Sequence, residues 1–441
     1  MGVRASIVGA GVAILWFATS AAAQDAGDSL VETGEPTTEA AQSTESTDAA
    51  PEVLVAAGSE PSTAAPTPTN PAPSATTTED GVVEVGSVHV SLENGPGLGP
   101  TPGLGTLPTF DTRGGIPWSV SIGTQTFGQY ELLFPSGADW NHRFSIPRAW
   151  LSLGFRVENA VGRVLLEGTR AIDDGALSGI ADDSFLLRLR EAWGGYRIAD
   201  LVEIRAGLVP TLLTPWLTQH WWLRGVARIG LREHDLLAPA DLGASAFIDL
   251  PEGFGRVGVS YTNGEGYSSR ELNRGKNLEL AADVHPLAFV PELRPLAIVL
   301  GYTNGSLGAG SARSDRVVGS LLWDQPEIGG GVTASYVLGL ADRGEREGGL
   351  IDAWLRGLLF EHLILGAQVL HFVRDLATGT DTLTSLTLTA GALVIDQIRI
   401  YLAVDGRFAD ALARVATPAW ERWDVRLVVE ADVVARFFGA L

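Results

Sequence analysis

The chain has 441 residues, enough for one large domain or two or three ordinary ones, and contains no cysteine, which excludes disulfides and a lipid-anchored lipoprotein. Its formal charge of −21 argues against nucleic acid as a partner. The hydrophobic content of 45% and the mean hydropathy of +0.16 are unusual for a secreted soluble protein. After the N-terminal region, however, no uninterrupted apolar run is long enough to predict a membrane-spanning helix.

The first 108 residues predict a leader followed by a linker. Arg4 precedes an apolar run at residues 6–18 and the small-residue stretch TSAAAQ, a layout typical of a secretory signal peptide with cleavage after Ala23. Residues 24–108 contain thirteen Asp or Glu, no Lys or Arg and no aromatic side chain. Such a composition cannot form a packed core, so we expect a disordered acidic linker. It is either an inert spacer or a tether to peptidoglycan or another periplasmic partner.

Residues 109–441 show a side-chain period of two, which is the period of a β-strand. In the stretch QIRIYLAVD, at residues 397–405, every even-numbered position is aliphatic and every odd-numbered position is polar or small. Sixteen segments of this kind are predicted, at residues 117–133, 144–157, 161–170, 185–198, 201–210, 241–250, 254–263, 277–286, 295–304, 314–324, 329–340, 349–360, 362–374, 382–394, 397–407 and 421–436. Turn-forming sequences separate them, and short connections alternate with longer ones, as in a membrane barrel.

A soluble all-β protein also alternates, so the alternation by itself leaves that fold open. The export signal and the uncharged aliphatic faces favour lipid outside, because an Arg facing lipid at mid-membrane costs about 2–4 kcal/mol. Aromatic side chains near segment ends are expected at the membrane interfaces: Trp118, Tyr130, Trp140, Tyr261, Tyr302, Trp420 and Trp423. We therefore expect an all-β fold, a transmembrane antiparallel β-barrel of about 16 strands in outer-membrane lipid, wide enough for an aqueous lumen.

The longest stretch without alternation, residues 211–241, follows the fifth predicted strand and is rich in aromatic and Arg residues. Arg224, Arg228 and Arg232 are spaced by four, so a short helix would place them on one face. The side chains left for packing are Leu223, Val226, Ile229 and Leu231. Folded into the lumen, this segment would narrow the channel, and its arginines would set selectivity. The competing interpretation is a loop packed at the rim or a subunit interface, with its arginines paired to Glu233 and Asp235.

Charged side chains on the polar faces of the strands are expected to line the lumen and to act there as a field rather than as a site. These candidates are Arg148, Arg156, Arg205, Glu279, Asp283, Arg399, Asp405, Arg426 and Glu430. No enzyme signature occurs: the seven histidines are scattered, and HExxH, GxSxG and P-loop motifs are absent from the sequence. We therefore predict no catalytic residue, no cofactor and no metal site.

Four stretches resemble the phosphate-selective porin family, porins O and P: LREAWGGYRIADLVEIRAGLVPTLLTP, LAPADLGASAF, GRVGVSYTNGEG and NLELAADVHPL, over residues 185–287. The resemblance implies a 16-stranded barrel, often a homotrimer, whose third extracellular loop folds into the lumen and lines an anion pathway. Members that select phosphate place Lys and Ser in that loop. Here the matching stretch PWLTQHWW offers Thr218, Gln219 and His220 but no Lys. From the resemblance we therefore infer the architecture of the family and not its phosphate specificity.

The sequence thus predicts a signal peptide at residues 1–23, a linker at 24–108 that stays in the periplasm, and an outer-membrane barrel at 109–441. The favoured function is a porin, a water-filled channel for passive diffusion of small hydrophilic solutes or inorganic ions, with a leaning toward anions. The alternative is a structural outer-membrane protein whose acidic tail tethers envelope layers.

Overall fold

The computed structural model describes residues 116–170, 185–199, 201–268, 274–307, 312–340, 344–417 and 420–440, and the backbone of three short strands before residue 94. The expected signal peptide and most of the expected linker lie outside the described residues. The chain divides into two units, Met1–Asn70 and Pro71–Leu441, and every described residue belongs to the second. Among the described residues, no helix has the length and apolar character needed to span a membrane.

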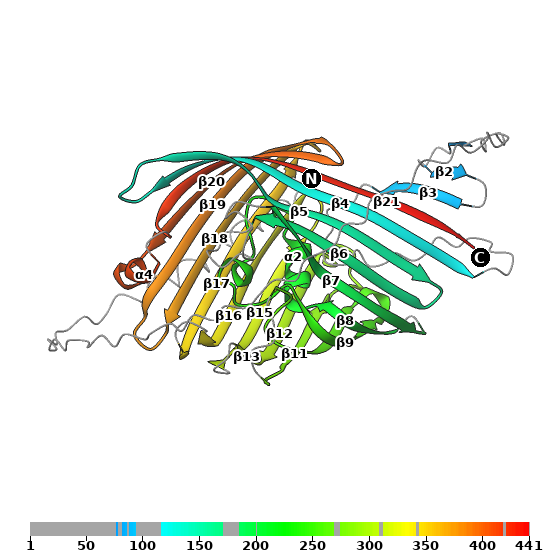
Figure 1. The fold of residues 1–441 in the computed structure, drawn as a ribbon, viewed down its shortest axis with the longest axis horizontal. Coiled ribbons are helices and arrows are strands. Elements are labelled where there is room, and N and C mark those ends of the chain that lie inside the picture. Colours follow the sequence, from blue (N-terminus) through cyan, green and yellow to red (C-terminus); the bar gives the residue numbers. More distant parts are fainter. Residues whose placement is uncertain are drawn as a thin grey trace, which may run out of the picture. The chain divides into compact units, whose positions relative to one another are not determined.

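Sixteen strands of the described chain form one closed antiparallel barrel (Figure 1). They are β4 (Pro117–Pro135), β5 (Asn141–Val157), β6 (Ala160–Arg170), β7 (Phe185–Ile198), β8 (Val202–Pro210), β9 (Ala240–Leu250), β10 (Gly255–Thr262), β11 (Asn277–Val284), β12 (Leu296–Asn304), β15 (Asp315–Asp324), β16 (Ile328–Leu340), β17 (Gly344–Leu359), β18 (Leu363–Asp375), β19 (Thr380–Ile395), β20 (Ile398–Ala409) and β21 (Arg422–Ala440). Each strand pairs with the next in this series. The barrel closes where β21 pairs with β4, from Arg422↔Pro135 to Ala440↔Pro117.

Each of the sixteen predicted segments coincides with one of these strands, so the predicted fold class is confirmed. The largest shift is in β17, which begins at Gly344 although the sequence DRGEREGG predicts a turn there. Its first residues pair with β16, as in Val337↔Gly348. The strand ladder is built from backbone groups, so glycines and charged residues can continue it beyond the aliphatic part of a strand.

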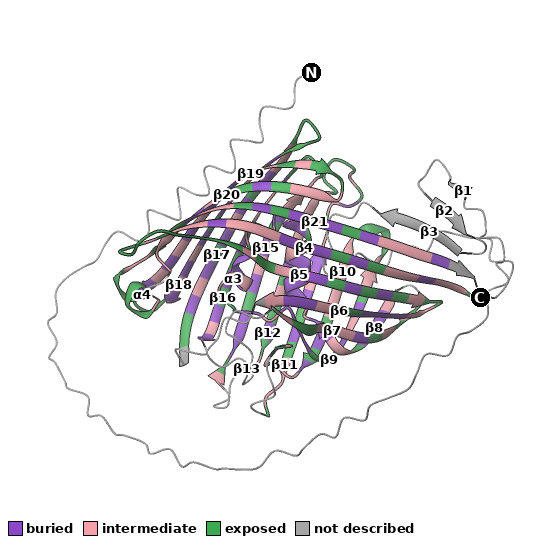
Figure 2. Ribbon diagram, turned by 45° about the horizontal axis from the view of Figure 1, so that its top comes forward, coloured by how far each residue is buried: buried purple, intermediate pink, exposed green. Residues whose placement is uncertain are grey.

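Along each strand the aliphatic positions face outward and the polar positions face the lumen, as Figure 2 shows by the alternation of exposed and buried residues. In β20, Leu402 is 52% exposed whereas its neighbour Tyr401 is 1% exposed. In β7, Leu187 is 67% exposed, whereas Arg188 and Arg190 lie on the opposite face of the strand, which points into the lumen. A soluble β-sandwich would bury its aliphatic faces. In this barrel the aliphatic faces point outward instead, which suits contact with lipid.

The aromatic side chains expected at the outer ends of strands divide into two groups. The first group has six members: Trp140, Tyr261, Tyr302 and Trp423 are exposed, and Trp118 and Tyr130 are half-buried and alternate with inward residues of β4. Trp420 instead packs against the lumen loop, with its ring centroid 5.2 Å from that of His234. Only the first group can therefore lie at a membrane interface.

The two ends of the barrel differ in the length of their connections. At one end the strands are joined by tight turns, as at 158–159, 251–254 and 360–362, with 285–295 as a longer exception. Glu158 and Phe360 in these turns have φ values of 53° and 52°, in the left-handed region that short hairpins require. At the other end the connections are longer, as at 211–239 and 263–276. We call these the short-turn end and the long-loop end.

Five shorter strands lie outside the ring of sixteen. β13 (Ser306–Leu307) and β14 (Ala312–Arg313) form a separate hairpin. β1 (Thr76–Thr77), β2 (Val82–Val85) and β3 (Val88–Glu93) fall within the expected linker and pair in series. β3 then lies along residues 434–438 of β21, beyond the last β21 residue that pairs with β20.

Candidate pore constriction

The segment between β8 and β9, residues 211–239, folds into the barrel lumen (Figure 1), as the sequence predicts. It contains α2 (Leu213–His220) and α3 (Gly230–Glu233). The backbone N–H groups of Leu212 and Leu213, at the start of α2, donate to the Glu279 carboxylate of β11 at 2.8 and 3.0 Å. The backbone N–H of Gly230 donates to Asp352 of β17 at 2.7 Å. Because carboxylates on distant strands satisfy free helix N–H groups, the loop is fixed across the lumen and not at the rim.

An apolar core holds this lumen loop against the inner wall. The four side chains predicted to pack, Leu223, Val226, Ile229 and Leu231, are all buried and belong to one cluster with wall residues. Trp221 contacts Trp354 of β17 with ring centroids 5.3 Å apart. The loop is therefore a packed part of the fold, and its shape is set by the barrel wall.

The expected helix through the three loop arginines is wrong. α2 ends at His220 and α3 begins at Gly230, so residues 221–229 are turns and extended chain. Gly225 lies in the break: glycine disfavours a helix, and its lack of a Cβ lets the loop approach the Phe127 ring of β4, which an added Cβ would meet at 2.8 Å. The close approach of loop and wall thus overrides the helical spacing in the sequence.

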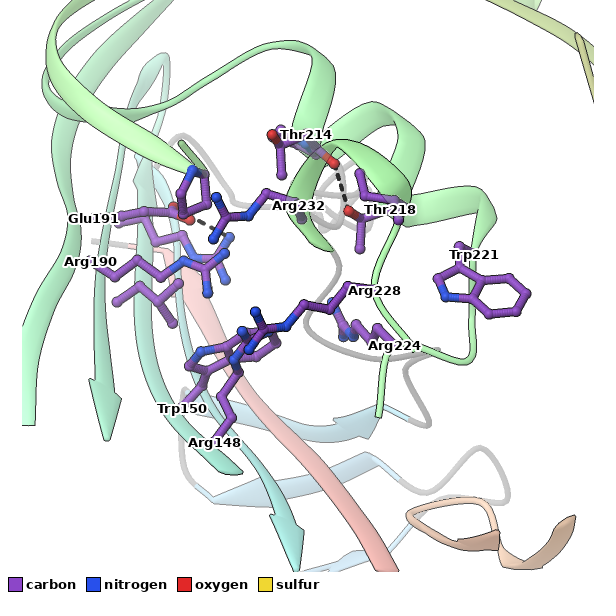
Figure 3. Close-up of a pocket in the computed structure, with 15 residues that line it drawn as sticks. Arg148, Trp150, Arg190, Glu191, Thr214, Thr218, Trp221, Arg224, Arg228 and Arg232 are labelled. Carbon is purple, nitrogen blue, oxygen red and sulfur yellow. Dashed lines mark hydrogen bonds and ion pairs between the residues drawn. The ribbon is translucent and has the colours of Figure 1, made fainter. Parts of the chain in front are cut away.

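The three loop arginines nevertheless line one cavity, which we call the inner cavity (Figure 3). Its lining residues are Arg148, Trp150, Arg163, Leu165, Arg190, Glu191, Thr214, Pro215, Thr218, Trp221, Arg224, Arg228, Ile229, Arg232 and Pro239. Figure 3 shows Arg148 and Arg190 entering from the wall and Arg228 and Arg232 from the loop, all directed into the same space. Six arginines and one glutamate among these residues make the field strongly positive.

Trp150 of β5 supports several of these cations. The guanidinium carbons of Arg148, Arg190 and Arg224 lie 5.0, 4.8 and 5.2 Å from its ring centroid. The face of an indole attracts cations, so one buried ring can hold guanidinium groups together against their mutual repulsion. Its Nε1–H donates to Glu167 at 3.0 Å, which fixes the ring.

Glu167 of β6 is the carboxylate at which the wall arginines meet. It lies 3.3 Å from Arg148, 3.2 Å from Arg188 and 3.0 Å from Arg190. It also accepts a hydrogen bond from the Tyr267 hydroxyl, in the loop after β10. One carboxylate therefore balances three guanidinium groups, and the excess positive charge remains.

A second cavity, the outer cavity, adjoins the inner one and has a volume of about 440 Å³. The two share Arg148, Arg228, Arg232 and Pro239. The outer cavity is mainly polar, with Thr, Ser, Asn and Tyr side chains from β9 to β12 and the adjoining loops. A solute passing from one cavity to the other would therefore pass the shared arginines.

Burial affects the pKa of two of the loop arginines, Arg224 and Arg232. Burial lowers the pKa of Arg224 to about 10, against the opposing effect of Glu430 and Asp432. Burial also lowers the pKa of Arg232, and the nearby charge of Arg190 adds to this. The lowering of the Arg232 pKa by Arg190 is expected where cations lie close together, whereas the lowering of the Arg224 pKa is due mainly to burial.

Of the three other loop candidates, only Thr218 faces the inner cavity, where its hydroxyl donates to the Thr214 carbonyl at 2.6 Å. Gln219 donates to Asp283 of β11 at 2.6 Å. His220 is buried, with Nδ1 2.9 Å from Asp324 of β15. Burial alone would lower the pKa of His220, but its hydrogen bonds to the two aspartates raise that pKa to about 9. Gln219 and His220 thus hold the loop to the wall.

In the competing interpretation, the loop arginines would pair with Glu233 and Asp235, but among the described residues only Arg232 lies near one of these carboxylates. Arg232 lies 3.8 Å from Asp235, which is exposed. Glu233 pairs with Arg407 of β20 at 2.9 Å instead. His234, between them in sequence, packs against Phe372 and Trp420, and burial lowers its pKa to about 3. No group of three or more His, Asp or Glu in the described part of the chain could hold a metal ion.

The predicted lumen residues on the strands take three kinds of position. Arg148 lines both cavities. Glu279 and Asp283 hold the loop, as described above. The others are distributed around the wall: Arg156 beside the turn after β5, Arg205 beside Glu203, Arg399 beside Glu430, and Arg426 3.8 Å from Asp405. The structure therefore brings together two pairs of these candidates, Arg399 with Glu430 and Arg426 with Asp405, but does not gather the nine at one site.

Several residues of the cavities are absent from the sequence-based candidates: Trp150, Arg163, Glu167, Arg188, Arg190, Glu191 and Tyr267. The signal was available for those that lie on strands. In the β7 sequence FLLRLRE, Arg188 and Arg190 alternate with outward leucines, so the period of two places both in the lumen. Tyr267 lies in a loop, where no periodicity applies.

No protein-family model matches the sequence, and no curated protein matches it. Solved structures do. OmpF of Salmonella typhi, in complex with daunomycin, aligns with a TM-score of 0.52 and 10% identity, over 71% of this chain and 97% of that one. An anion-selective porin from Comamonas acidovorans aligns with a TM-score of 0.50 and 14% identity, over 71% of this chain and 99% of that one. At such identities the likeness shows the fold alone, a sixteen-stranded barrel.

Proposed function

We propose that the protein is an outer-membrane porin, a water-filled channel through which small hydrophilic solutes and ions diffuse passively. One observation carries the proposal: a closed barrel presents aliphatic side chains outward and charged side chains inward, and a packed loop lines adjoining cavities in its lumen. In lipid the backbone hydrogen bonds of such a closed barrel are all made between its strands. A solute in the lumen meets water and fixed charges.

We infer a preference for anions. Six arginines and one glutamate line the inner cavity, and three of those arginines, Arg148, Arg228 and Arg232, also line the outer one. Clustered fixed cations raise the local concentration of anions and repel cations. Phosphate specificity is not part of the proposal, because the loop lacks the Lys residues that accompany it in the family that the sequence resembles.

The placement of the chain follows from the same proposal. Residues 1–23 would be removed on export, the short-turn end would face the periplasm, and the acidic segment 24–108 would lie there, since β4 begins at that end. The resemblance to the phosphate-selective porins supports a homotrimer.

The anion preference is tested with the purified protein in a planar lipid bilayer. We expect discrete conductance steps, and a reversal potential in a KCl gradient on the side that indicates chloride selectivity. Replacing Arg224, Arg228 and Arg232 together by Ala should move the reversal potential toward that of a non-selective pore. Unchanged conductance and reversal potential in this triple variant would show that the loop arginines do not form the constriction.

The tethering alternative is favoured by one observation, the departure of the acidic segment from the short-turn end. Deleting residues 24–108 while keeping the leader separates the two functions. A porin keeps its conductance after the deletion. A tether keeps the conductance but loses its association with peptidoglycan in envelope fractions.

A further inference from the structure

The inner cavity combines a cluster of arginines with an apolar surface, and a site for inorganic anions does not need the apolar surface. Its charged part consists of six arginines and Glu191, which lies 3.7 Å from Arg163, and most of the other lining residues are apolar: Trp150, Leu165, Pro215, Trp221, Ile229 and Pro239. The outer cavity also has apolar lining residues, Pro147, Leu236, Leu237, Ala238 and Pro239, but hydroxyl, amide and charged groups make up the larger part of its lining. A hydrated chloride or sulfate gains nothing from contact with apolar side chains, whereas a carbon skeleton does.

The cations approach this apolar surface from two sides. Arg148 and Arg190 come from the wall strands β5 and β7, and Arg228 and Arg232 come from the lumen loop (Figure 3). A ligand with one negative group at each end can therefore meet a guanidinium group at both ends at the same time. A planar guanidinium matches a carboxylate with two parallel hydrogen bonds.

Arg228 is the cation best placed to receive such a ligand. Its side chain is exposed to the lumen, and within the described residues no ion pair joins it. Its backbone is nevertheless fixed, because the Gln368 side chain of β18 donates to the Arg228 carbonyl at 2.9 Å. The fixed backbone keeps the guanidinium group at this part of the lumen, where it can pair with an incoming anion once its exposed side chain becomes ordered.

We propose that the inner cavity binds small aliphatic dicarboxylates, which cross the channel by transient binding between the wall arginines and the loop arginines. This inference rests on the proposed channel function and names its solute class. Zwitterions such as amino acids are disfavoured, because their ammonium group would face arginines on both sides. Dicarboxylates leave water more readily here than inorganic dianions do, because their methylene groups contact Leu165, Pro215 and Ile229.

The test compares two dianions of equal charge, glutarate and sulfate, as blockers of the chloride current through single channels at neutral pH. We expect glutarate to reach half-block at a concentration about tenfold lower than sulfate, the effect of roughly two methylene groups leaving water. Equal block by the two ions, or stronger block by sulfate, would overturn the dicarboxylate site.

Two substitutions of the same kind locate the site. Arg228→Gln should weaken the glutarate block about tenfold, as expected for loss of one charged hydrogen-bonding partner. Arg414→Gln makes the same charge change on the exposed helix α4 (Ala411–Ala416), outside both cavities, and should leave the block unchanged. If the two variants behave alike, the site is not where we place it.

Leu165→Ala removes part of the apolar surface and should reduce the glutarate-to-sulfate ratio while the block by sulfate stays constant. If that variant does not assemble, the comparison of the two ions on the unaltered protein still decides. A protein that forms no conductance steps, or that selects cations, contradicts the proposed function itself. A conducting, anion-selective channel without a preference for glutarate contradicts only this inference.

Discussion

Two sides of the same lumen use arginine in different ways. The arginine wall, formed by Arg148, Arg163, Arg188 and Arg190 with the facing loop arginines, has few carboxylates to balance it. On the other side, which we call the paired wall, four arginines have carboxylate partners: Arg356 with Asp324, Arg374 with Asp381, Arg399 with Glu430, and Arg407 with Asp405 and Glu233.

The comparison separates two roles of buried charge. Paired charges cancel at short range, so the paired wall contributes to the fold and attaches the loop, and it adds little to the field that a solute meets. Unbalanced charges keep their field, which acts on any ion in the lumen. The arginine wall should therefore govern selectivity, and the paired wall should govern the stability of the loop.

The largest expected effect is on the paired wall, from Arg356→Ala. Arg356 bonds to Asp324, donates to the Gln325 carbonyl at 3.1 Å and stacks on Trp222 of the loop at 3.4 Å. Its removal leaves Asp324 with His220 as its remaining charged partner and abolishes the stack on Trp222, so it should lower the free energy of unfolding by about 3 kcal/mol.

Urea titration of the protein in detergent measures the change. Arg414→Ala is the matched control, since its pair with Glu421 is on the surface and should contribute about 1 kcal/mol or less. Equal losses in the two variants would contradict the distinction between buried and surface pairs.

A smaller effect on the stability of the loop is expected from a change of pH. It acts through His220, which holds the loop to the wall beside Asp324. Since its pKa is raised from the ordinary value to about 9, the charged imidazole stabilises the loop fully below pH 6.5 and loses this effect as the pH rises through about 9. The groups that face it are Asp283, Asp324 and Arg356 from the wall and Gln219 from its own helix.

Current fluctuations of single channels should therefore increase as the pH rises through about 9. His220→Gln cannot titrate, so its fluctuations should not change over the same range. A transition of the same size in His220→Gln would assign the pH effect to another group.

The smallest effect is expected from Glu167→Gln on the arginine wall. The substitution removes the carboxylate near Arg148, Arg188 and Arg190 but keeps an oxygen that can accept hydrogen bonds. The reversal potential in a KCl gradient should move further toward that of a perfectly chloride-selective pore, with conductance steps of similar size. A shift in the opposite direction would show that Glu167 organises the arginines more than it offsets their charge.

Much of the fold could be predicted because its signal is local. The period of two in each strand and the turn sequences between strands identified all sixteen strands, and the same alternation assigned the outward face. The loop was found by the absence of that alternation. The helix expected through Arg224, Arg228 and Arg232 failed because spacing along the chain cannot report that Gly225 lies against Phe127 of a distant strand.

The candidate site was only partly predictable for the same reason. The alternation of residues along β5 shows that Arg148 faces the lumen. It does not show that Arg148, Arg190 and Arg224 all contact the ring of Trp150. Likewise, Gln219 and His220 were expected at the constriction, and the wall aspartates hold them instead.

By itself, the sequence determined the strands, their two faces and the position of the one long inserted loop, because each depends on neighbouring residues and on backbone geometry. The tertiary structure decided which charges meet. Closing the barrel brings β21 beside β4 and places the loop between opposite walls, so the distances among cations from β5, β7 and residues 224–232 are set by the whole ring. Whether an arginine is balanced or exposed to solutes depends on those distances, and they exist only in the folded molecule.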